Sequence, residues 1–527
     1  MIDNFGYFMR GKAFIFIFIF LSVLFFIGFS ATAQEFMYKG SVYSDLRLAV
    51  PGKDKDPADH DFRFDRSDNS LNLTGLFNWG SVDVYADLSF VFSGRSKVDR
   101  FHTLHERGSV DPFYIESSGL YLRINDFVLD GLDLKIGRQI VEWGSADKFN
   151  PTSVINSVDL EDPMDFGRLV ANEMIVLSYS PGWMIDGDET PIFDEFRMEL
   201  VYVPMFRSSL LPESGRLAFS EPNQFRNFVN SETLHGLVNI QELFLKYGGE
   251  VLYDVRIKEP DWALKNSQVG GKISFSLLGV DFGLMGYYGY DHNNQPQQVL
   301  VNAVSSDANV QVLMNAAMPA VAGTKEEMED LMGLLTSYGE EGKVRTIKGF
   351  TDVELGFPRV GVFGAEFSTS LDFLGGMGFW GEATLTFHDD VMIDLDINGT
   401  RLSERQFKKG HYWKAVLGID NTITKWLYVN VQYVRGFVNE FGASSIGNYV
   451  VAGVDVKGFN EQALLRVFAI LNMDDPSTIL YPMLSFKFWQ ATELVAGALL
   501  HFGGDNSTFG NRIVGRNIVF LQGRYSF

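Results

Sequence analysis

The chain has 527 residues and no cysteine, so neither disulfide bonds nor thiolate-bound metals are expected to hold it together. Its formal net charge of −22 at pH 7 argues against a nucleic-acid-binding protein, which needs a basic surface for phosphates. With 52 glycines and 47 phenylalanines against 16 prolines, the composition favours aromatic-rich strands over helices. A chain of this length fits either several soluble domains or one large closed barrel.

The N-terminal residues have the pattern of a secretory signal peptide. Arg10 and Lys12 precede a long apolar run, and Ala31 and Ala33 form a cleavage site of the small-x-small type. Residues 1–33 are therefore predicted to be removed. A retained membrane anchor is the alternative, because the run is about long enough to cross a bilayer, but the cleavage site favours removal. No later stretch is apolar over the ~20 residues that another membrane-spanning helix would need.

Alternating apolar and polar residues recur along residues 34–527, and a period of two is typical of β-strands. In Val82–Phe92, for example, Val, Ala, Leu and Phe share one face, and Asp83, Tyr85 and Asp87 take the other. Each predicted strand approaches the ~9–11 residues that a tilted strand needs to cross a bilayer. The predicted strands are Phe36–Val50, Ser70–Trp79, Val82–Phe92, Gly119–Asn125, Leu132–Gln139, Glu173–Ser180, Phe196–Pro204, Lys272–Leu277, Val280–Tyr290, Phe363–Phe373, Met377–Phe387, Trp413–Ile419, Leu427–Tyr433, Asn448–Val456, Leu465–Met473, Leu480–Phe488, Leu494–Phe502 and Gly515–Phe527. We therefore predict an all-β fold, a transmembrane antiparallel β-barrel of about 18 strands, closed because lipid cannot satisfy an open sheet edge.

The positions of the connections support this barrel. If the chain starts and ends in the periplasm, the number of strands is even and the periplasmic turns are short. Short turns are predicted at Gly80, Leu278-Gly279, Gly375-Gly376, Asp420-Asn421 and Gln490. Long extracellular loops are predicted at 94–113, 140–172, 205–266, 292–360, 389–409 and 503–514, with 140–172, 205–266 and 292–360 partly helical. Segment 182–194 is longer than a periplasmic turn should be. A further candidate strand, Arg345–Glu354, is assigned to loop 292–360, because including it in the barrel would make the number of barrel strands odd. A soluble sandwich or propeller is disfavoured, because the alternation has no fixed repeat and the signal peptide implies export.

These patterns predict an outer-membrane protein of a Gram-negative-type cell envelope. Its final strand ends on an aromatic residue, Phe527, and we expect the barrel assembly machinery to act through this strand. Outer-membrane lipid is the main expected partner, and periplasmic export partners are a further option. No nucleic acid, cofactor or resident metal is expected.

One block after an early strand carries the most distinctive motif. Its residues are Gly137, Arg138, Gln139, Glu142, Trp143, Gly144, Asp147, Asn150 and Pro151. With the barrel pattern around it, this block resembles a family of porin-like outer-membrane barrels that includes alginate-export-type and related uncharacterised proteins with a "GRQ…WG" stretch. The resemblance implies passage of a substrate through the lumen; in the alginate type, arginines and lysines line the path of a polyanion. This chain is acidic overall and departs from that pattern.

The same block can also be interpreted from its residues alone. Asn150-Pro151 is a helix-start or turn signal, so the loop is predicted either to fold into the barrel and narrow it or to anchor at the membrane rim through Arg138 and Trp143. An acidic run follows it. The run offers weak calcium candidates, with a solvated face as the alternative because the regular ligand spacing is missing: Asp159, Glu161, Asp162 and Asp165.

Strand parity predicts which charged side chains face the lumen. The inward cations are Arg123, Lys135, Arg197, Lys272, Lys414, Arg466, Lys487 and Arg524. The inward acids are Asp83, Asp87, Asp133, Glu199, Asp281, Glu366, Asp372, Glu382 and Glu493. Such charges either set the selectivity of a pore or pair across strands and stiffen the wall.

Loop 292–360 contains a predicted amphipathic helix. A capping box, Thr324 to Glu327, precedes Met328, Leu331 and Leu335 at helical spacing, and Gly339 marks the end. This helix is expected to act as a lid or plug, or to pack on the barrel rim.

The sequence favours a channel that passes polar solutes or an exported polymer through a lumen constricted by loops. A carrier of hydrophobic molecules is one alternative, because the long loops hold apolar residues such as Phe225, Phe228, Leu243, Phe244 and Leu245. A barrel with an adhesin or assembly role is another. No arrangement of catalytic residues is recognisable, so an enzyme is not expected.

Overall fold

The computed structural model describes residues 36–51, 62–98, 101–181, 193–211, 232–317, 325–489, 491–504, 507–510 and 516–527. The predicted signal peptide lies outside the described residues, as do Phe225, Phe228, Thr324 and Gln490.

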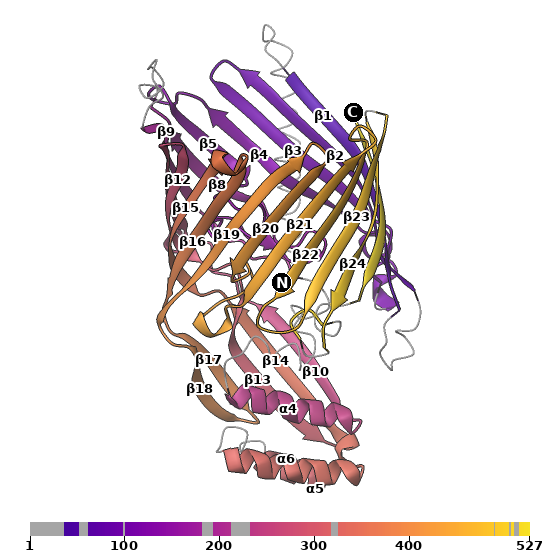
Figure 1. The fold of residues 1–527 in the computed structure, drawn as a ribbon. Helices are drawn as coiled ribbons and strands as arrows, with labels where there is room; N and C mark the ends of the chain where they lie inside the picture. The colour runs from indigo at the N-terminus through magenta and orange to yellow at the C-terminus, as the bar shows by residue number, and fades with distance from the viewer. Residues whose placement is uncertain are drawn as a thin grey trace.

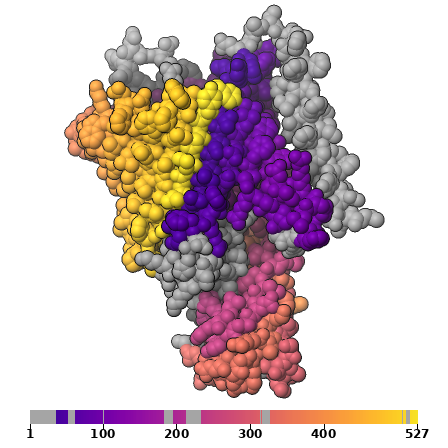
Figure 2. All heavy atoms as spheres, turned by 90° about the vertical axis from the view of Figure 1, so that its right-hand side faces the viewer, coloured from indigo at the N-terminus to yellow at the C-terminus, as the bar shows by residue number. Residues whose placement is uncertain are grey.

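Eighteen antiparallel strands form one closed wall (Figure 1). In order around it they are β1 (Phe36–Ala49), β2 (Arg63–Trp79), β3 (Val82–Ser93), β4 (Phe113–Ile124), β5 (Leu132–Gln139), β8 (Asn172–Tyr179), β9 (Phe193–Val203), β11 (Gln268–Leu277), β12 (Val280–Tyr290), β15 (Arg359–Leu371), β16 (Met377–His388), β19 (Gly410–Thr424), β20 (Leu427–Arg435), β21 (Asn448–Gly458), β22 (Ala463–Asn472), β23 (Thr478–Phe488), β24 (Thr492–Phe502) and β25 (Ile518–Ser526). The ring closes where β1 pairs with β25, and Figure 2 shows these two ends of the chain side by side. The predicted fold class and strand number are confirmed.

The two faces of the wall differ as the alternation predicts. Outward apolar side chains such as Leu284, Leu484 and Leu521 are each more than half exposed in the isolated protein, whereas inward Asp83 and Glu382 are buried. In a closed sheet, the backbone N–H and C=O groups of every wall strand find hydrogen-bond partners on neighbouring strands, and the apolar outer surface faces lipid. The protein is therefore an outer-membrane barrel, with short periplasmic turns at one end and long extracellular loops at the other.

Some strand ends differ from the prediction. β2 and β4 begin earlier, at Arg63 and Phe113, because their charged extracellular ends pair with a loop inside the barrel. The turn predicted at Asp420-Asn421 is wrong, since β19 continues to Thr424. Both residues stay in the sheet, paired with β20, where the Tyr428 hydroxyl donates to Asp420 at 2.8 Å.

A second domain stands on the extracellular side, below the barrel in Figure 1. Its elements come from the three loops that follow β9, β12 and β16: α4 (Glu232–Lys246), β10 (Glu250–Ile257), β13 (Gln295–Ser305), α5 (Ala308–Ala317), α6 (Lys325–Glu340), β14 (Ile347–Gly356), β17 (Val391–Ile397) and β18 (Thr400–Phe407). The five strands make a mixed sheet in the order β10-β14-β13-β17-β18. We call this unit the extracellular domain. None of the described helices is long and apolar enough to cross a membrane.

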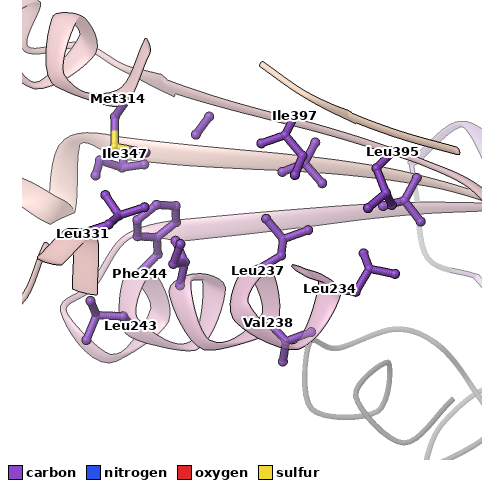
Figure 3. Close-up of a cluster of buried hydrophobic side chains, with 14 of the residues drawn as sticks. Leu234, Leu237, Val238, Leu243, Phe244, Met314, Leu331, Ile347, Leu395 and Ile397 are labelled. Atoms are coloured by element: carbon purple, nitrogen blue, oxygen red, sulfur yellow. The ribbon is translucent and has the colours of Figure 1, made fainter. Parts of the chain in front are cut away.

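The extracellular domain has a hydrophobic core of its own (Figure 3). Phe244 and Leu237 of α4 and Leu331 of α6 point toward Ile347 and Leu395 of the sheet. The predicted amphipathic helix exists as α6, but it packs in this core, so the plug and the rim helix are both wrong. The candidate strand Arg345–Glu354 becomes β14 of the second sheet, which leaves the barrel strands even in number.

We expect Phe244→Ala to destabilise the extracellular domain while the barrel stays folded. Phe244 is 1% exposed, and truncating a buried Phe costs about 3–5 kcal/mol. Limited proteolysis should cut the extracellular loops, while the barrel keeps its heat-modifiable migration on gels. Leu252→Ala is the control, because Leu252 is 47% exposed. Loss of barrel migration together with the domain would contradict a separate core.

Candidate functional site

The candidate site is residues 140–171, between β5 and β8, which we call the lumen loop. Its base is tied together by Asn156, which is 1% exposed. The Asn156 amide donates to the carbonyls of Gln139 (3.2 Å) and Val170 (2.8 Å), and its Oδ1 accepts from Val141 N (2.8 Å). The loop holds no helix, contrary to the prediction, but a short pair of strands, β6 (Val158–Asp159) and β7 (Arg168–Leu169).

From this base the lumen loop crosses the barrel to the far wall. Trp143 donates through Nε1 to Glu199 of β9 at 2.7 Å. Glu382 of β16 then accepts three hydrogen bonds, from Ala146 N at 2.9 Å, from Thr152 N at 3.2 Å and from the Thr152 hydroxyl. Residues on both arms of one turn thus bind a single buried carboxylate. This contact fixes the loop against β16.

The loop then returns to the opposite wall, where arginines bind its acidic run. Arg47 of β1 bridges Asp45 (2.7 Å) and Asp162 (2.6 Å). Arg66 of β2 pairs with Glu161 and lies 3.4 Å from Asp162. We call residues 157–171, which include this run, the return arm.

A second arginine contact holds the return arm to β4. Arg168 reaches Glu116 of β4 and Asp159 of the loop itself, both at 2.7 Å. The lumen loop is therefore attached to the wall on both sides of the barrel. These contacts place the loop inside the barrel.

The lumen loop divides the interior into two unlike parts. Against β8, β9, β12, β15, β16 and β19–β21 many inward side chains are buried, and the apolar ones among them form two clusters. Trp143, Ile155 and Phe149 of the loop belong to these clusters, with Val362 and Val434 of the wall. We call this side the packed half. Within these clusters the close packing leaves no path for polar solutes.

Along β2–β5 most inward side chains are charged or polar, and several of them are half-exposed, although Asp83 and Gln139 are buried. We call this side the open half. Tyr85 and Tyr121 stack there at 5.0 Å, and Lys135 lies 5.8 Å from the centre of the Tyr121 ring. Asp87 and Asn72 are likewise half-buried. Water can reach these groups.

The motif residues do not all lie in the lumen: most belong to the lumen loop, but one of them lies on the outer face of the wall. Gln139, Trp143, Asp147, Asn150 and Pro151 belong to the lumen loop or its base. Arg138 lies on the outward register of β5, opposite outward Leu120, and bonds Glu173 at 3.1 Å. Its place in a constriction motif is therefore wrong, because the side chain anchors the rim outside the lumen. Gly137 has φ of +132°, and a Cβ there would lie 2.4 Å from Leu120 O, so only glycine fits.

The calcium candidates bind arginines or a lysine instead of facing a common point. Asp159 pairs with Arg168, Glu161 and Asp162 pair with Arg66 and Arg47, and Asp165 lies 3.9 Å from Lys148. Within the described ranges, no group of three or more His, Cys, Asp or Glu side chains is placed to hold a metal ion. The calcium hypothesis is wrong, because arginine and lysine side chains of the protein supply the positive charge opposite these carboxylates.

The other predicted inward charges form pairs or single contacts along the wall. The ion pairs are Arg123–Asp83, Arg197–Glu199, Lys272–Glu366 and Arg466–Asp455. Single contacts join Arg524 to the Tyr43 ring, Asp281 to Ser276, Glu493 to Ser485 and Asp133 to the Asp126 N–H. Lys487 and Glu493 are register partners. Asp372 begins a turn after β15 (Asp372–Leu374), so it is not on a strand.

Lys414 differs from the others because it belongs to the packed half. Its ammonium donates to Phe437 O at 2.7 Å and faces a cavity of about 80 Å³ that Asp291 and Tyr412 also line. His292, on the loop after β12, faces the same cavity, and burial lowers the pKa of its imidazole. The cavity is lined by the lumen loop and by β12, β15, β16 and β19, so Lys414 is not on the open half.

Sequence reasoning missed several residues that hold the lumen loop. Asp45 and Arg47 share one parity within the first predicted strand, so the same alternation would have found them. Arg66 and Glu116 lay outside the predicted strands, just before Ser70–Trp79 and Gly119–Asn125. Thr152 carried no signal, since its role depends on a partner, Glu382, that is 230 residues away in the sequence.

Together, the closed wall, its apolar outer surface and the loop inside its lumen define the class of protein, a porin-like outer-membrane β-barrel. Residues 118–463 match the model of a family described as a protein of unknown function, DUF1302. The chain belongs to this family, and the matched residues include the lumen loop and the extracellular domain. The predicted porin-like barrel is confirmed, whereas the alginate-export resemblance stays a prediction.

Solved barrels resemble the fold only distantly. A crystal structure of OccAB1 from Acinetobacter baumannii matches at a TM-score of 0.46 and 7% identity, covering 94% of this chain and 98% of that one. OmpF of Salmonella typhi, solved in complex with daunomycin, matches at 0.35 and 9%, over 93% and 97%. In-vitro folded OmpT of Vibrio cholerae matches at 0.35 and 10%, over 94% and 100%. These values support no inference about function, and a search of curated proteins finds no significant match.

Proposed function

We propose that the protein is an outer-membrane channel that passes polar solutes along the open half, between the lumen loop and β2–β5. The observation that carries the proposal is the unequal burial of the inner face. Inward Val434 and Gln432 of the packed half are at most 1% exposed, whereas Asp87, Tyr121 and Lys135 of the open half are half-exposed. A path for solutes is therefore expected on one side only.

The charges along this path favour small polar solutes over a polyanion. Arg123 is paired with Asp83 at 2.7 Å, and Asp87 lies on the same wall as Lys135, so both signs of charge are present. A polyanion would need an excess of cations along its route. The alginate-export type of substrate is therefore the less favoured version of the proposal.

Single-channel recording of the refolded mature protein in a planar bilayer tests the proposal. The chain has no cysteine, so a single introduced cysteine can be modified without background. We expect a charged thiol reagent to reduce the current through Asp87→Cys, on the open half, and to leave Gln432→Cys, on the packed half, unaffected. Ion selectivity is read from the reversal potential in a salt gradient.

Silence of well-inserted protein would contradict a channel, and block of both cysteine variants would contradict the one-sided path. In the first case the favoured function becomes a barrel that presents its extracellular domain to a partner. The hydrophobic-carrier alternative has lost most of its support among the described residues, because Leu243 and Phe244 are buried in the core of that domain and only Leu245 is exposed, at 46%.

The docking of the return arm should be insensitive to pH above about 4. Burial alone raises the pKa of Asp162, but the hydrogen bonds and charge of Arg47, and then the charge of Arg66, outweigh it and place the pKa below its usual 3.8. A lowered pKa stabilises the docked return arm at all higher pH, and this contribution is lost as the pH falls through the lowered value. We expect the contribution of the return arm to the conductance to be flat from about pH 8 to 4 and to change only below.

Two variants check this pH profile. Asp162→Asn should raise conductance at neutral pH. Asp165→Asn should leave the flat region unchanged, because burial raises the pKa of Asp165 and its contacts with Lys148 and Arg168 are long, at 3.9 and 3.7 Å. An acid-induced rise in conductance below pH 4 that is the same in Asp162→Asn as in the unmodified protein would contradict the assignment to Asp162.

The proposal also includes assembly through β25. This strand pairs with β1 in the closed wall, and Phe527 exchanges two backbone hydrogen bonds with Gly40, each of 2.9 Å. The barrel assembly machinery is expected to recognise the strand before that pairing forms. Outer-membrane lipid covers the finished outer surface.

A further inference from the structure

One arginine at the extracellular rim faces away from the lumen. Arg359 begins β15 on the same register as Phe363, which is 64% exposed on the outer surface. Its guanidinium lies over the outward rings of Tyr288 (5.0 Å) and Tyr290 (4.7 Å) of β12. The cation is therefore held in a fixed position at the border of the membrane.

This cation has no anion within the described part of the chain. Arg359 forms no ion pair there; its Nη2 donates to Lys265 O at 2.9 Å, and its buried Nε has no hydrogen-bond partner. Lys265 is exposed and forms no ion pair with any described carboxylate either. The Arg359 guanidinium thus contacts the backbone of a residue that carries a second, exposed cation, and no described carboxylate pairs with either charge.

The segment that carries Lys265 presents apolar side chains beside these cations. Trp262 is 71% exposed and Leu264 is 86% exposed. The segment is fixed to the rim, because the Tyr290 hydroxyl donates to Asn266 Oδ1 at 2.8 Å. Tryptophan and leucine beside cations are typical of residues at the level of lipid headgroups. Asp261, the acid of this turn, is exposed and its backbone carbonyl closes the turn.

We propose that Arg359 and Lys265 bind the phosphate of an outer-leaflet lipid, with Trp262 and Leu264 beside its acyl chains. The Arg359 Nε is buried, so the guanidinium would reach a phosphate through its terminal Nη groups, and the exposed ammonium of Lys265 adds a point charge. The tyrosines orient the guanidinium, and the apolar pair distinguishes a lipid from a free phosphate. This site does not depend on the proposed channel.

Binding of a diphosphorylated lipid A to the full chain in detergent, followed by native mass spectrometry, tests the site. One cation near a phosphate surface is worth roughly a factor of five in affinity. The double variant Arg359→Gln/Lys265→Gln should therefore bind this lipid at least about tenfold more weakly. Arg256→Gln is the matched control, because Arg256 is an exposed arginine of the extracellular domain, paired with Asp254.

A second variant and a competition experiment distinguish a lipid phosphate from free phosphate. Trp262→Ala/Leu264→Ala should also weaken lipid binding, and inorganic phosphate should compete poorly. Equal binding by the double variant and the control would overturn the proposal, as would competition by inorganic phosphate at the same concentration as the lipid. Unchanged heat-modifiable migration of each variant shows that the barrel has folded.

Discussion

Replacing Glu382 by alanine is expected to release the lumen loop from the far wall and raise single-channel conductance several-fold. The variant leaves three donors without their acceptor, the backbone N–H groups of Ala146 and Thr152 and the Thr152 hydroxyl. Each buried donor left unpaired costs about 1–3 kcal/mol, so the docked state loses about 3 kcal/mol or more. Current noise should rise as well, because the freed turn exchanges between positions.

A conservative variant and a matched control make this result specific. Glu382→Gln keeps one carbonyl acceptor and should give an intermediate conductance. Glu493→Ala removes another inward carboxylate, one that bonds Ser485 on the wall and does not touch the loop, and should leave the conductance near that of the unmodified protein. An unchanged conductance in Glu382→Ala would show that the loop does not limit the current.

The second large effect is expected at Arg47. Arg47→Gln removes the cation that binds Asp45, which is 2% exposed, and Asp162 of the return arm. Breaking a buried ion pair from one side costs about 3–5 kcal/mol, because the remaining charges stay buried without a partner. We expect the return arm to detach and cation preference to increase, measured as a shift of the reversal potential in a salt gradient.

The double variant Arg47→Gln/Asp162→Asn separates charge from structure. With both charges removed, the amide side chains introduced at positions 47 and 162 can hydrogen-bond each other. Part of the docking of the return arm and most of the original ion selectivity should therefore return. The coupling free energy from the four proteins measures the pair itself. Independent, additive effects of the two changes would contradict a direct role of this pair in holding the arm.

The wall of the barrel could be predicted because its signal is local. Each strand alternates with a period of two and is punctuated by turns such as Gly80 and Leu278-Gly279, and lipid outside requires the sheet to close. The inward parity of Asp83, Glu199 and Glu382 follows from the same rule. Pairing between neighbouring strands then brought some of these charges to a partner of opposite sign, as in Arg123 of β4 and Asp83 of β3.

The extracellular domain could not be predicted because its sheet is built from segments far apart in the sequence. β10 pairs in parallel with β14, and β13 pairs in parallel with β17, although different loops supply them. Leu243 and Phe244 illustrate the consequence: as apolar loop residues they suggested a hydrophobic ligand, but they face a core supplied by the other loops.

By itself, the sequence determined the fold class, the number of wall strands and the two chemically different faces of the wall, since these depend on neighbours along one strand. Only the tertiary structure decided where the lumen loop lies. The motif around Trp143 was compatible with the rim and with the lumen, and the choice depended on Glu199, Glu382, Arg47 and Arg66, on four separate strands. A contact across a barrel leaves no periodicity in either segment, so the same residues had to be brought together by the fold before their chemistry could be recognised.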